Sequence, residues 1–163
     1  QAGGFRPAGY VWNAWAKGYK IGVQASSDHL STHISYSCTI AEEFTREGLL
    51  DAMRKRHNYG ATDNIVLDYR MRVGEREYLQ GDVVPGESAD FELRVKILGT
   101  APVKQVDVIR GQDFVYTLQN QAQDVEFRYV DQSPKSGEQH YYVRVQQADG
   151  QMAWSSPIWL VVP

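Results

Sequence analysis

The chain of 163 residues carries 17 basic and 20 acidic residues, for a net charge of −3, and it shows no block of like charge. We therefore expect neither a nucleic-acid partner nor a membrane partner, since both attract clusters of Lys and Arg. Hydrophobic residues make up 42% of the chain, as in ordinary globular proteins. No apolar run approaches the roughly 18 residues of a transmembrane helix.

Cys38 is the single cysteine, which excludes an intrachain disulfide and a zinc site built from several cysteines. A single cysteine does not indicate in which cellular compartment the protein is located. The chain begins at Gln1 rather than Met, and no signal peptide is recognisable. We therefore expect a processed product or an excised piece. The length suggests one domain or two small ones.

Residues 9–20 (GYVWNAWAKGYK) place aromatic and small residues at helical spacing, with Gly18 where a helix commonly ends. Residues 19–27 (YKIGVQASS) alternate between apolar and polar and then turn small. This pattern predicts a buried strand over residues 20–26, and a long loop follows it.

The clearest helix pattern covers residues 45–60. Thr45 is a suitable N-cap, and Glu47 in the first turn complements the helix dipole. Positive charge fills the last turns, and an apolar stripe is formed by Leu49, Leu50 and Met53. The order helix, strand, loop, helix indicates that residues 1–62 are a piece of an α/β fold. They contain one good strand, so its sheet neighbours must come from missing polypeptide or another chain.

From residue 63 the hydrophobic period becomes two, and turn signals recur. Strands are predicted at 63–74, 89–98, 103–109, 113–118, 123–130, 139–147 and 153–162. Short strands at this density are typical of an immunoglobulin-like antiparallel β-sandwich, here without the Cys…Trp…Cys pattern of antibody domains. We place a domain boundary near residue 63, between residues 1–62 and residues 63–163. No Pro/Gly/Ser-rich linker separates the two parts, which predicts that they pack together.

The stretch ASSDHLSTHISY (25–36) brings Asp28, His29 and His33 within six positions. Asp28 and His29 would follow the strand at 20–26, at the strand end where α/β folds carry their active sites. Carboxylate and imidazole groups are suitable ligands for Zn²⁺, Mn²⁺ or Fe. The same residues are also typical of a polar loop, because Ser and Asp side chains accept hydrogen bonds from nearby backbone N–H groups.

Basic residues of the second helix suggest a further role. Arg46, Arg54 and Arg56 could present guanidinium groups to an anionic substrate, although a solvated helix face or a domain-interface pair is the more common outcome. His57 in the last turn fits a residue that complements the helix dipole. His140 lies within a strand pattern and receives little functional weight.

Two aromatic residues and the thiol have competing interpretations. Trp154 and Trp159 near the C-terminus could form a sugar-stacking platform or belong to an aromatic core or interface. Cys38 could act as a nucleophile beside His33 and His29, but a small buried thiol is the simpler interpretation. The sequence contains neither a Gly-x-Ser-x-Gly nucleophile elbow nor a phosphate-binding Gly-rich loop.

Three segments, ASSDHLSTHISY, TREGLLDAMRKRHNYGATDNI and YYVRVQQADGQMAWSSPIW, occur in this order and at similar spacing in a large group of bacterial proteins. Those proteins carry a domain of unknown function and belong to the PHP-like (polymerase and histidinol phosphatase) superfamily of metal-dependent hydrolases. The chain resembles their C-terminal portion over nearly its whole length.

The resemblance implies an α+β fold, with the last elements of a distorted (βα)7 barrel in residues 1–62 and an immunoglobulin-like β-sandwich in residues 63–163. It also implies that Asp28 and His29 are ligands of a site holding two or three divalent metals. The superfamily often places one residue between this Asp and His, so either His29 or His33 is the direct imidazole ligand. The remaining ligands of the superfamily have no counterpart in this chain.

On this hypothesis the chain is the C-terminal part of a phosphoesterase- or amidohydrolase-type enzyme. Its metals (Zn, Mn or Fe) would activate water for attack on a small-molecule substrate. His33 would be a third ligand or a proton carrier, and Arg46 or Arg56 would contact the substrate. The isolated chain would be inactive. Many members of the group look exported, which favours a periplasmic or secreted location. The alternative is a non-catalytic β-sandwich module that contacts a carbohydrate or a partner protein.

Overall fold

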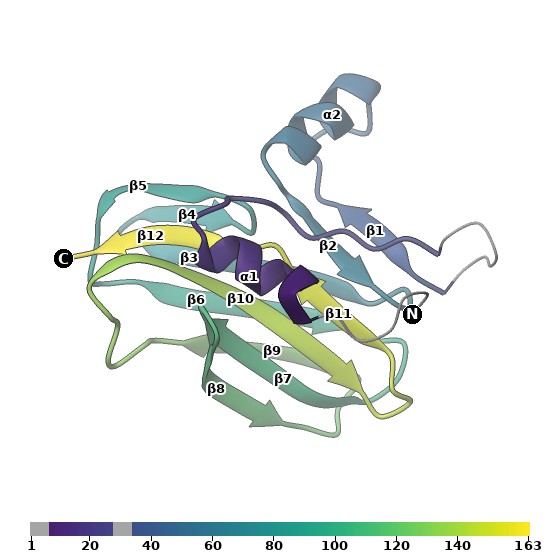
Figure 1. Ribbon diagram of the computed structural model, residues 1–163. Coiled ribbons are helices and arrows are strands. Elements are labelled where there is room, and N and C mark those ends of the chain that lie inside the picture. The colour runs from purple at the N-terminus through teal and green to yellow at the C-terminus, as the bar shows by residue number, and fades with distance from the viewer. Residues whose placement is uncertain (1–6, 28–33) are drawn as a thin grey trace.

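The computed structural model describes residues 7–27 and 34–163 as two facing β-sheets with two short α-helices (Figure 1). In chain order the elements are η1 (Pro7–Gly9), α1 (Val11–Ala16), β1 (Tyr36–Thr39), α2 (Arg46–Arg54), β2 (Asn58–Ala61), β3 (Val66–Val73), β4 (Arg76–Leu79), β5 (Val83–Glu87), β6 (Glu92–Leu98), β7 (Val103–Arg110), β8 (Asp113–Gln119), β9 (Asp124–Tyr129), β10 (Gly137–Gln147), β11 (Met152–Ser155) and β12 (Ile158–Val162). None of the helices in these residues is long and apolar enough to cross a membrane.

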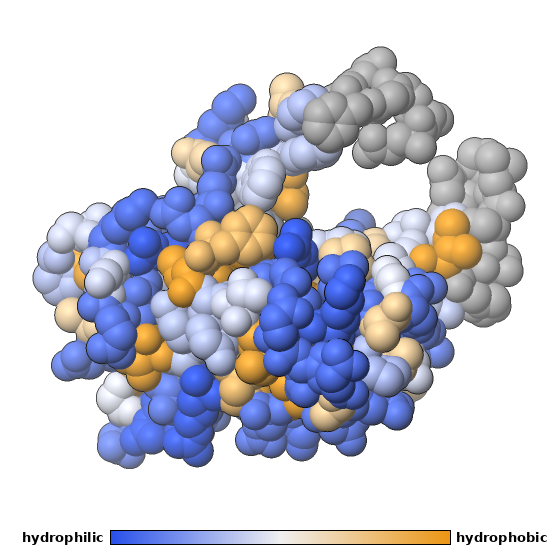
Figure 2. All heavy atoms as spheres, turned by 90° about the horizontal axis from the view of Figure 1, so that it is seen from below, coloured by the Kyte–Doolittle hydropathy of each residue, from blue (hydrophilic) through white to orange (hydrophobic). Residues whose placement is uncertain are grey.

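The smaller sheet contains four antiparallel strands in the order β4-β3-β6-β9. Its side chains alternate strictly, so that Leu67, Tyr69 and Met71 of β3 are buried while Asp68 and Arg70 face outward. The outer face is charged, and Arg70 and Arg94 form ion pairs with neighbouring carboxylates there. This face is therefore a solvated surface. Figure 2 shows a view in which most of the protein surface is hydrophilic and the hydrophobic patches are separate.

The larger sheet contains eight strands and is organised around β10, which is 11 residues long. The first half of β10 pairs with β12, and the second half pairs with β11. Its other edge pairs with β7, which in turn pairs with β8. Beyond β11 and β12 the sheet continues through β2 and β1 on one side and through β5 on the other. The pairing of β5 with β12 is parallel, and the remaining pairs are antiparallel.

The main core lies between the two sheets. Its buried side chains include Leu67, Tyr69, Met71, Leu93, Val95 and Ile97 from the smaller sheet, and Val106, Val108, Tyr141, Val143, Val145, Ile158 and Leu160 from the larger one. Burying one such side chain contributes roughly 1.5–3 kcal/mol to folding, so this interface is the main source of stability. Two sheets packed face to face in this way form a sandwich-like structure.

A second, smaller cluster lies on the outer face of the larger sheet. Trp15 of α1 packs there against Ile109, Tyr142 and Trp159, which point away from the main core. The indole N–H of Trp15 donates to the carbonyl of Ile21 at 3.0 Å, which anchors the segment after the helix. The N-terminal segment therefore lies across the sheet as a partial third layer, with α1 in front of β10 in Figure 1.

The prediction of an α+β fold with the last elements of a (βα)7 barrel is wrong. The described residues form mostly antiparallel sheets, and no barrel fragment is present among them. α2 joins β1 to β2, which pair antiparallel with Tyr36 opposite Ala61, whereas a barrel helix joins two parallel strands. The sandwich-like packing of the later strands does agree with their period-two pattern.

Residues 19–27 do not form the predicted buried strand. This segment is extended but lies on the outer face of the larger sheet, where side chains hold it. The Val23 N–H donates to Ser156 Oγ at 2.9 Å, and Asn58 Nδ2 donates to the Val23 carbonyl at 2.8 Å. Val23 packs against the cluster around Trp15. The alternation arises because one side of an extended segment faces an aromatic surface, not because the segment belongs to a sheet.

The helix predicted over residues 45–60 is shorter than expected. Thr45 is confirmed as the N-cap, since its side chain accepts from the Gly48 N–H at 3.0 Å. The helix ends at Arg54, Arg56 takes a φ of 63°, and the next residues form β2. β2 pairs with β1 on one edge and with β11 on the other, and these ladders outweigh continuation of the helix.

β1, α2 and β2 together form an arm (residues 36–61) whose helix projects from the sandwich (Figure 1). In α2 only Ala52 is buried, and the predicted apolar stripe stays partly exposed at Leu50 and Met53. The base of the arm continues the larger sheet, because Ala61 of β2 lies opposite Ala153 of β11. The division of the chain near residue 63 stays a prediction.

Candidate ligand-binding groove

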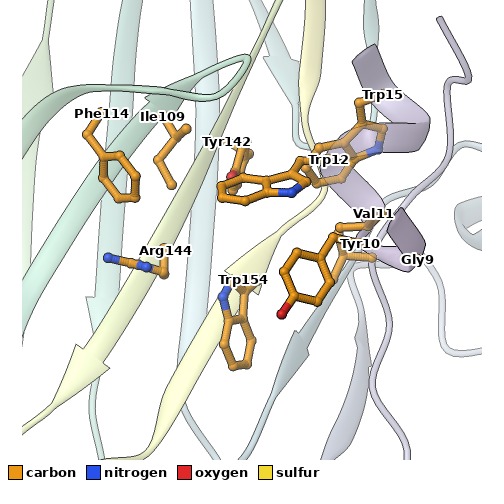
Figure 3. Close-up of a pocket in the computed structure, with 11 residues that line it drawn as sticks. Gly9, Tyr10, Val11, Trp12, Trp15, Ile109, Phe114, Tyr142, Arg144 and Trp154 are labelled. Carbon is orange, nitrogen blue, oxygen red and sulfur yellow. The ribbon is translucent and has the colours of Figure 1, made fainter. Parts of the chain in front are cut away.

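A groove with a volume of about 430 Å³ opens on the outer face of the larger sheet (Figure 3). Strands β7, β8, β10 and β11 form its base, and the N-terminal segment forms one wall. It is lined by Gly9, Tyr10, Val11, Trp12, Trp15, Val23, Ile109, Phe114, Tyr142, Arg144 and Trp154. The size lies within the usual range of small-ligand pockets, roughly 300–1,000 Å³.

The floor of the groove is rigid and apolar. Ile109, Tyr142 and Trp15 belong to the outer cluster and are almost completely buried. The ring centroids of Trp15 and Tyr142 are 4.9 Å apart, which locks α1 onto β10. The period of two places Tyr142 and Arg144 on the same outward face of β10, while Tyr141 and Val143 enter the main core. The strand therefore supplies both the core and the groove.

Aromatic side chains with accessible faces surround this floor. Tyr10 and Trp12 lie on the N-terminal wall with ring centroids 6.2 Å apart, and Trp154 stands beside them from β11 (Figure 3). On the opposite side, Phe114 of β8 is 49% exposed. Exposed aromatic rings at a pocket offer flat apolar faces on which a ligand can stack.

Among the described residues that line the groove, Arg144 alone is charged, and Asp107 holds it in place. Its Nε and Nη2 donate to Asp107 Oδ2 at 3.0 and 2.8 Å. Its guanidinium carbon also lies 4.9 Å from the centroid of the Phe114 ring, in a cation–π contact. Within residues 7–27 and 34–163, Nη1 has no hydrogen-bond partner, so it remains available to a ligand.

The other polar groups of the lining are mainly donors. The indole N–H groups of Trp12 and Trp154 make no hydrogen bond within the described part of the chain, in contrast to that of Trp15. Burial raises the pKa of Tyr142 to about 12, so this hydroxyl keeps its proton at neutral pH. The described lining contains no carboxylate, amide or imidazole side chain. The groove thus combines aromatic faces with hydrogen-bond donors.

The residues predicted as metal ligands lie outside the described residues. This applies to Asp28, His29 and also to His33, so the structure does not place them. Among the residues that it does describe, no three His, Cys, Asp or Glu side chains gather as a metal site requires. The described residues by themselves therefore do not fit a divalent metal, and the predicted ligand roles stay predictions.

The predicted substrate-binding arginines do not reach the groove. Arg46 is the first residue of α2 and is exposed on the arm, as is Arg54. Arg56 instead donates from Nε to the Gly81 carbonyl at 2.9 Å and lies over the Trp159 ring at 5.6 Å. It therefore connects the arm to the sandwich. The predicted contact of Arg46 with a substrate stays a prediction.

The remaining histidines have structural surroundings. His57 Nε2 lies 2.7 Å from Asp82 Oδ1, an ion pair if the imidazole is protonated. These two residues line a larger cleft of about 660 Å³ between α2 and the sandwich, together with several exposed carboxylates. His140 packs its ring against Trp15, with centroids 5.7 Å apart.

Cys38 and the two C-terminal tryptophans lie in three different environments. Cys38 is partly buried against the main core, and burial raises the pKa of its thiol, which disfavours the reactive thiolate. Trp159 is 2% exposed and belongs to the outer cluster. Trp154 stands at the groove. One tryptophan is thus part of a core and the other is accessible to ligands.

Sequence reasoning missed most of the groove. The sequence pattern predicts a helix for Tyr10 and Trp12 and a strand for Tyr142 and Arg144, and it indicates no site between them. The signal was present in the period of β10, whose outward positions carry an aromatic residue and then a cation. The pattern of β10 does not indicate which segment lies opposite it. The N-terminal segment is more than 100 residues earlier in the chain, and it meets this strand only after folding.

Comparison with known proteins finds bacterial relatives without an assigned activity. An uncharacterized protein of Chlamydia pneumoniae is 31% identical over 147 residues, covering 80% of this chain and 24% of its own length. Uncharacterized proteins of Chlamydia trachomatis and Chlamydia muridarum are each 28% identical over 147 residues, covering 82% of this chain. The chain spans about a quarter of the length of these relatives. No protein-family model and no solved structure matches the chain.

Proposed function

We propose that this chain is a non-catalytic β-sandwich binding module of a longer protein, and that the aromatic groove is its ligand site. The observation that supports the proposal is the arrangement of accessible Trp12, Trp154 and Phe114 around a rigid floor. A preformed floor reduces the entropy that a ligand must overcome, and aromatic faces supply most of the contact energy in many interfaces.

The lining favours binding over catalysis. Acid–base and nucleophilic chemistry rely on His, carboxylate or thiol groups, and the described lining supplies none of them. Arg144 is held by Asp107 and can orient a ligand by a hydrogen bond. The groove therefore combines two features of a recognition site, aromatic contact surfaces and a positioned hydrogen-bond donor.

The proposal is tested by titrating the whole chain with oligosaccharides and with peptides while the indole N–H signals are followed by NMR. We expect ligand-dependent shifts of the Trp12 and Trp154 signals. Trp12→Ala and Trp154→Ala should each weaken binding at least about tenfold, as for a central aromatic contact. Phe44→Ala is the matched control, because Phe44 is 96% exposed on the arm and lies outside the groove.

Two results would contradict the proposal. One is binding that survives both tryptophan substitutions, and the other is the absence of any shift at the groove across both ligand panels. The hydrolase activity suggested by the resemblance concerns the longer protein and remains a separate proposal with its own test.

A further inference from the structure

We infer that the groove binds an extended, proline-rich peptide segment in the polyproline II conformation. The inference rests on the proposed binding function and names the class of ligand. It follows from the hydrogen-bonding character of the groove together with its aromatic faces.

The groove has a surplus of donors. Trp12 and Trp154 each present an indole N–H without a partner in the described part of the chain, and Arg144 presents Nη1. An indole nitrogen and a guanidinium can only donate. The phenolic oxygens of Tyr10 and Tyr142 are the lining side-chain atoms that can accept. A well-matched ligand must therefore bring acceptors and few donors.

A proline-rich segment has this composition. Each proline offers a carbonyl with two lone pairs and has no N–H. Its backbone makes no internal hydrogen bonds in the polyproline II helix, so the carbonyls are exposed. The pyrrolidine rings pack well between aromatic side chains, which is how grooves lined by aromatic residues recognise such segments. The ligand is already extended and loses little conformational entropy on binding.

A saccharide matches the same groove less well. Every sugar hydroxyl is a donor as well as an acceptor, so a buried sugar needs acceptor side chains in the protein. The described lining has no Asp, Glu, Asn or Gln side chain to serve in this way. Asp107, the partner of Arg144, is 1% exposed and already accepts from Arg144, Thr117 and Gln105.

Arg144 can bind a neutral ligand as well as an anionic one. Its charge is paired with Asp107, and two of its three nitrogens are committed to that carboxylate. What remains is a fixed donor on the groove floor between β8 and β11. A neutral carbonyl oxygen is a sufficient partner for it.

The test uses the whole chain and an oligoproline of about ten residues, blocked at both ends, with a Gly/Ser peptide of equal length and a neutral hexasaccharide for comparison. Binding is measured by calorimetry and by the indole N–H signals. We expect the oligoproline alone to bind and to shift the Trp12 and Trp154 signals. Trp12→Phe and Trp154→Phe keep a ring and remove the donor, so each should weaken binding about threefold to tenfold.

Phe44→Ala is again the control and should bind as the unmodified chain does. Thermal unfolding of each variant shows whether it is folded, and two separate Trp→Phe variants keep the test valid if one of them does not fold. Oligoproline binding that both Trp→Phe variants retain in full would overturn the inference, as would loss of binding in Phe44→Ala.

The outcomes separate the two proposals. If the hexasaccharide binds at the groove and the oligoproline does not, the peptide inference fails and the binding module stands. If neither ligand nor the control peptide shifts a groove signal, both proposals fail.

Discussion

Arg144 donates two hydrogen bonds to a single carboxylate oxygen of Asp107, at 3.0 and 2.8 Å, across the β7–β10 ladder. Asp107 is almost completely buried and also accepts from Thr117 Oγ1 at 2.7 Å and from Gln105 Nε2 at 2.9 Å. These donors satisfy the hydrogen-bonding capacity of a carboxylate that is shielded from water. Asp107 thereby fixes the position of Arg144 in the groove lining.

Replacing this carboxylate should destabilise the fold. Asp107→Ala leaves Arg144 without its partner and removes the acceptor of Thr117 and Gln105, so we expect the free energy of unfolding to fall by about 3 kcal/mol. Urea unfolding of the variant and the unmodified chain measures the difference. Lys135→Ala, which breaks the exposed pair with Asp113, should leave stability unchanged. A loss no larger than that of the control would show that the Asp107 network contributes little.

The junction between the arm and the sandwich depends on Gly81. Its φ is 99°, and an added Cβ would collide with the backbone carbonyl of Arg56. Gly81→Ala should therefore cost about 2 kcal/mol or more, from backbone strain and from the collision together. Gly74→Ala is the matched control, because Gly74 also has a positive φ but open space around its Cβ position. Equal losses of stability in the two variants would mean that the collision relaxes at no cost.

His140 gives stability a dependence on pH. Its Nε2 is buried without a hydrogen-bond partner in the described part of the chain, and burial lowers the pKa of the imidazole, with Glu138 acting in the opposite direction. The unfolded chain then binds a proton more readily than the folded one. The free energy of unfolding should fall as the pH drops below about 6.5, the ordinary pKa of histidine, and should level off below the pKa of His140 in the folded chain.

The variant His140→Phe isolates this effect. It retains a ring against Trp15 and has no titrating group. The difference in unfolding free energy between variant and unmodified chain should be constant above pH 7 and should shift in favour of the variant between about pH 6.5 and 5. A difference that stays constant over the whole range would contradict a lowered pKa at His140.

The metal hypothesis is tested in the longer protein. We propose that Asp28 and His29 bind a divalent metal there, Zn, Mn or Fe, since carboxylate and imidazole are suitable ligands. The double variant Asp28→Ala, His29→Ala should lose bound metal in elemental analysis, whereas His57→Ala should retain it. Unchanged metal content in the double variant would refute the assignment. The 163-residue chain alone, given Zn²⁺ or Mn²⁺, should show no hydrolysis.

Local patterns predicted the elements that depend on near neighbours. Thr45 as N-cap was correct, because the cap is a contact between residues three positions apart. The alternation of Leu67, Tyr69 and Met71 predicted a strand with one buried face. The segment at 19–27 and the end of the second helix were predicted wrongly. In both cases the deciding contacts involve residues far apart in the chain: Ser156 with Val23, 133 residues apart, and β11 with β2.

The sequence by itself determined where this protein is apolar every second residue, where most of its turns fall and which residue caps its helix, since these depend on short-range sterics and burial. The tertiary structure alone decided that the N-terminal helix lies across β10 and that Trp12, Trp154 and Arg144 share one groove. Those three residues come from separate elements, and only the packing of two sheets and the aromatic cluster between α1 and the larger sheet brings them together.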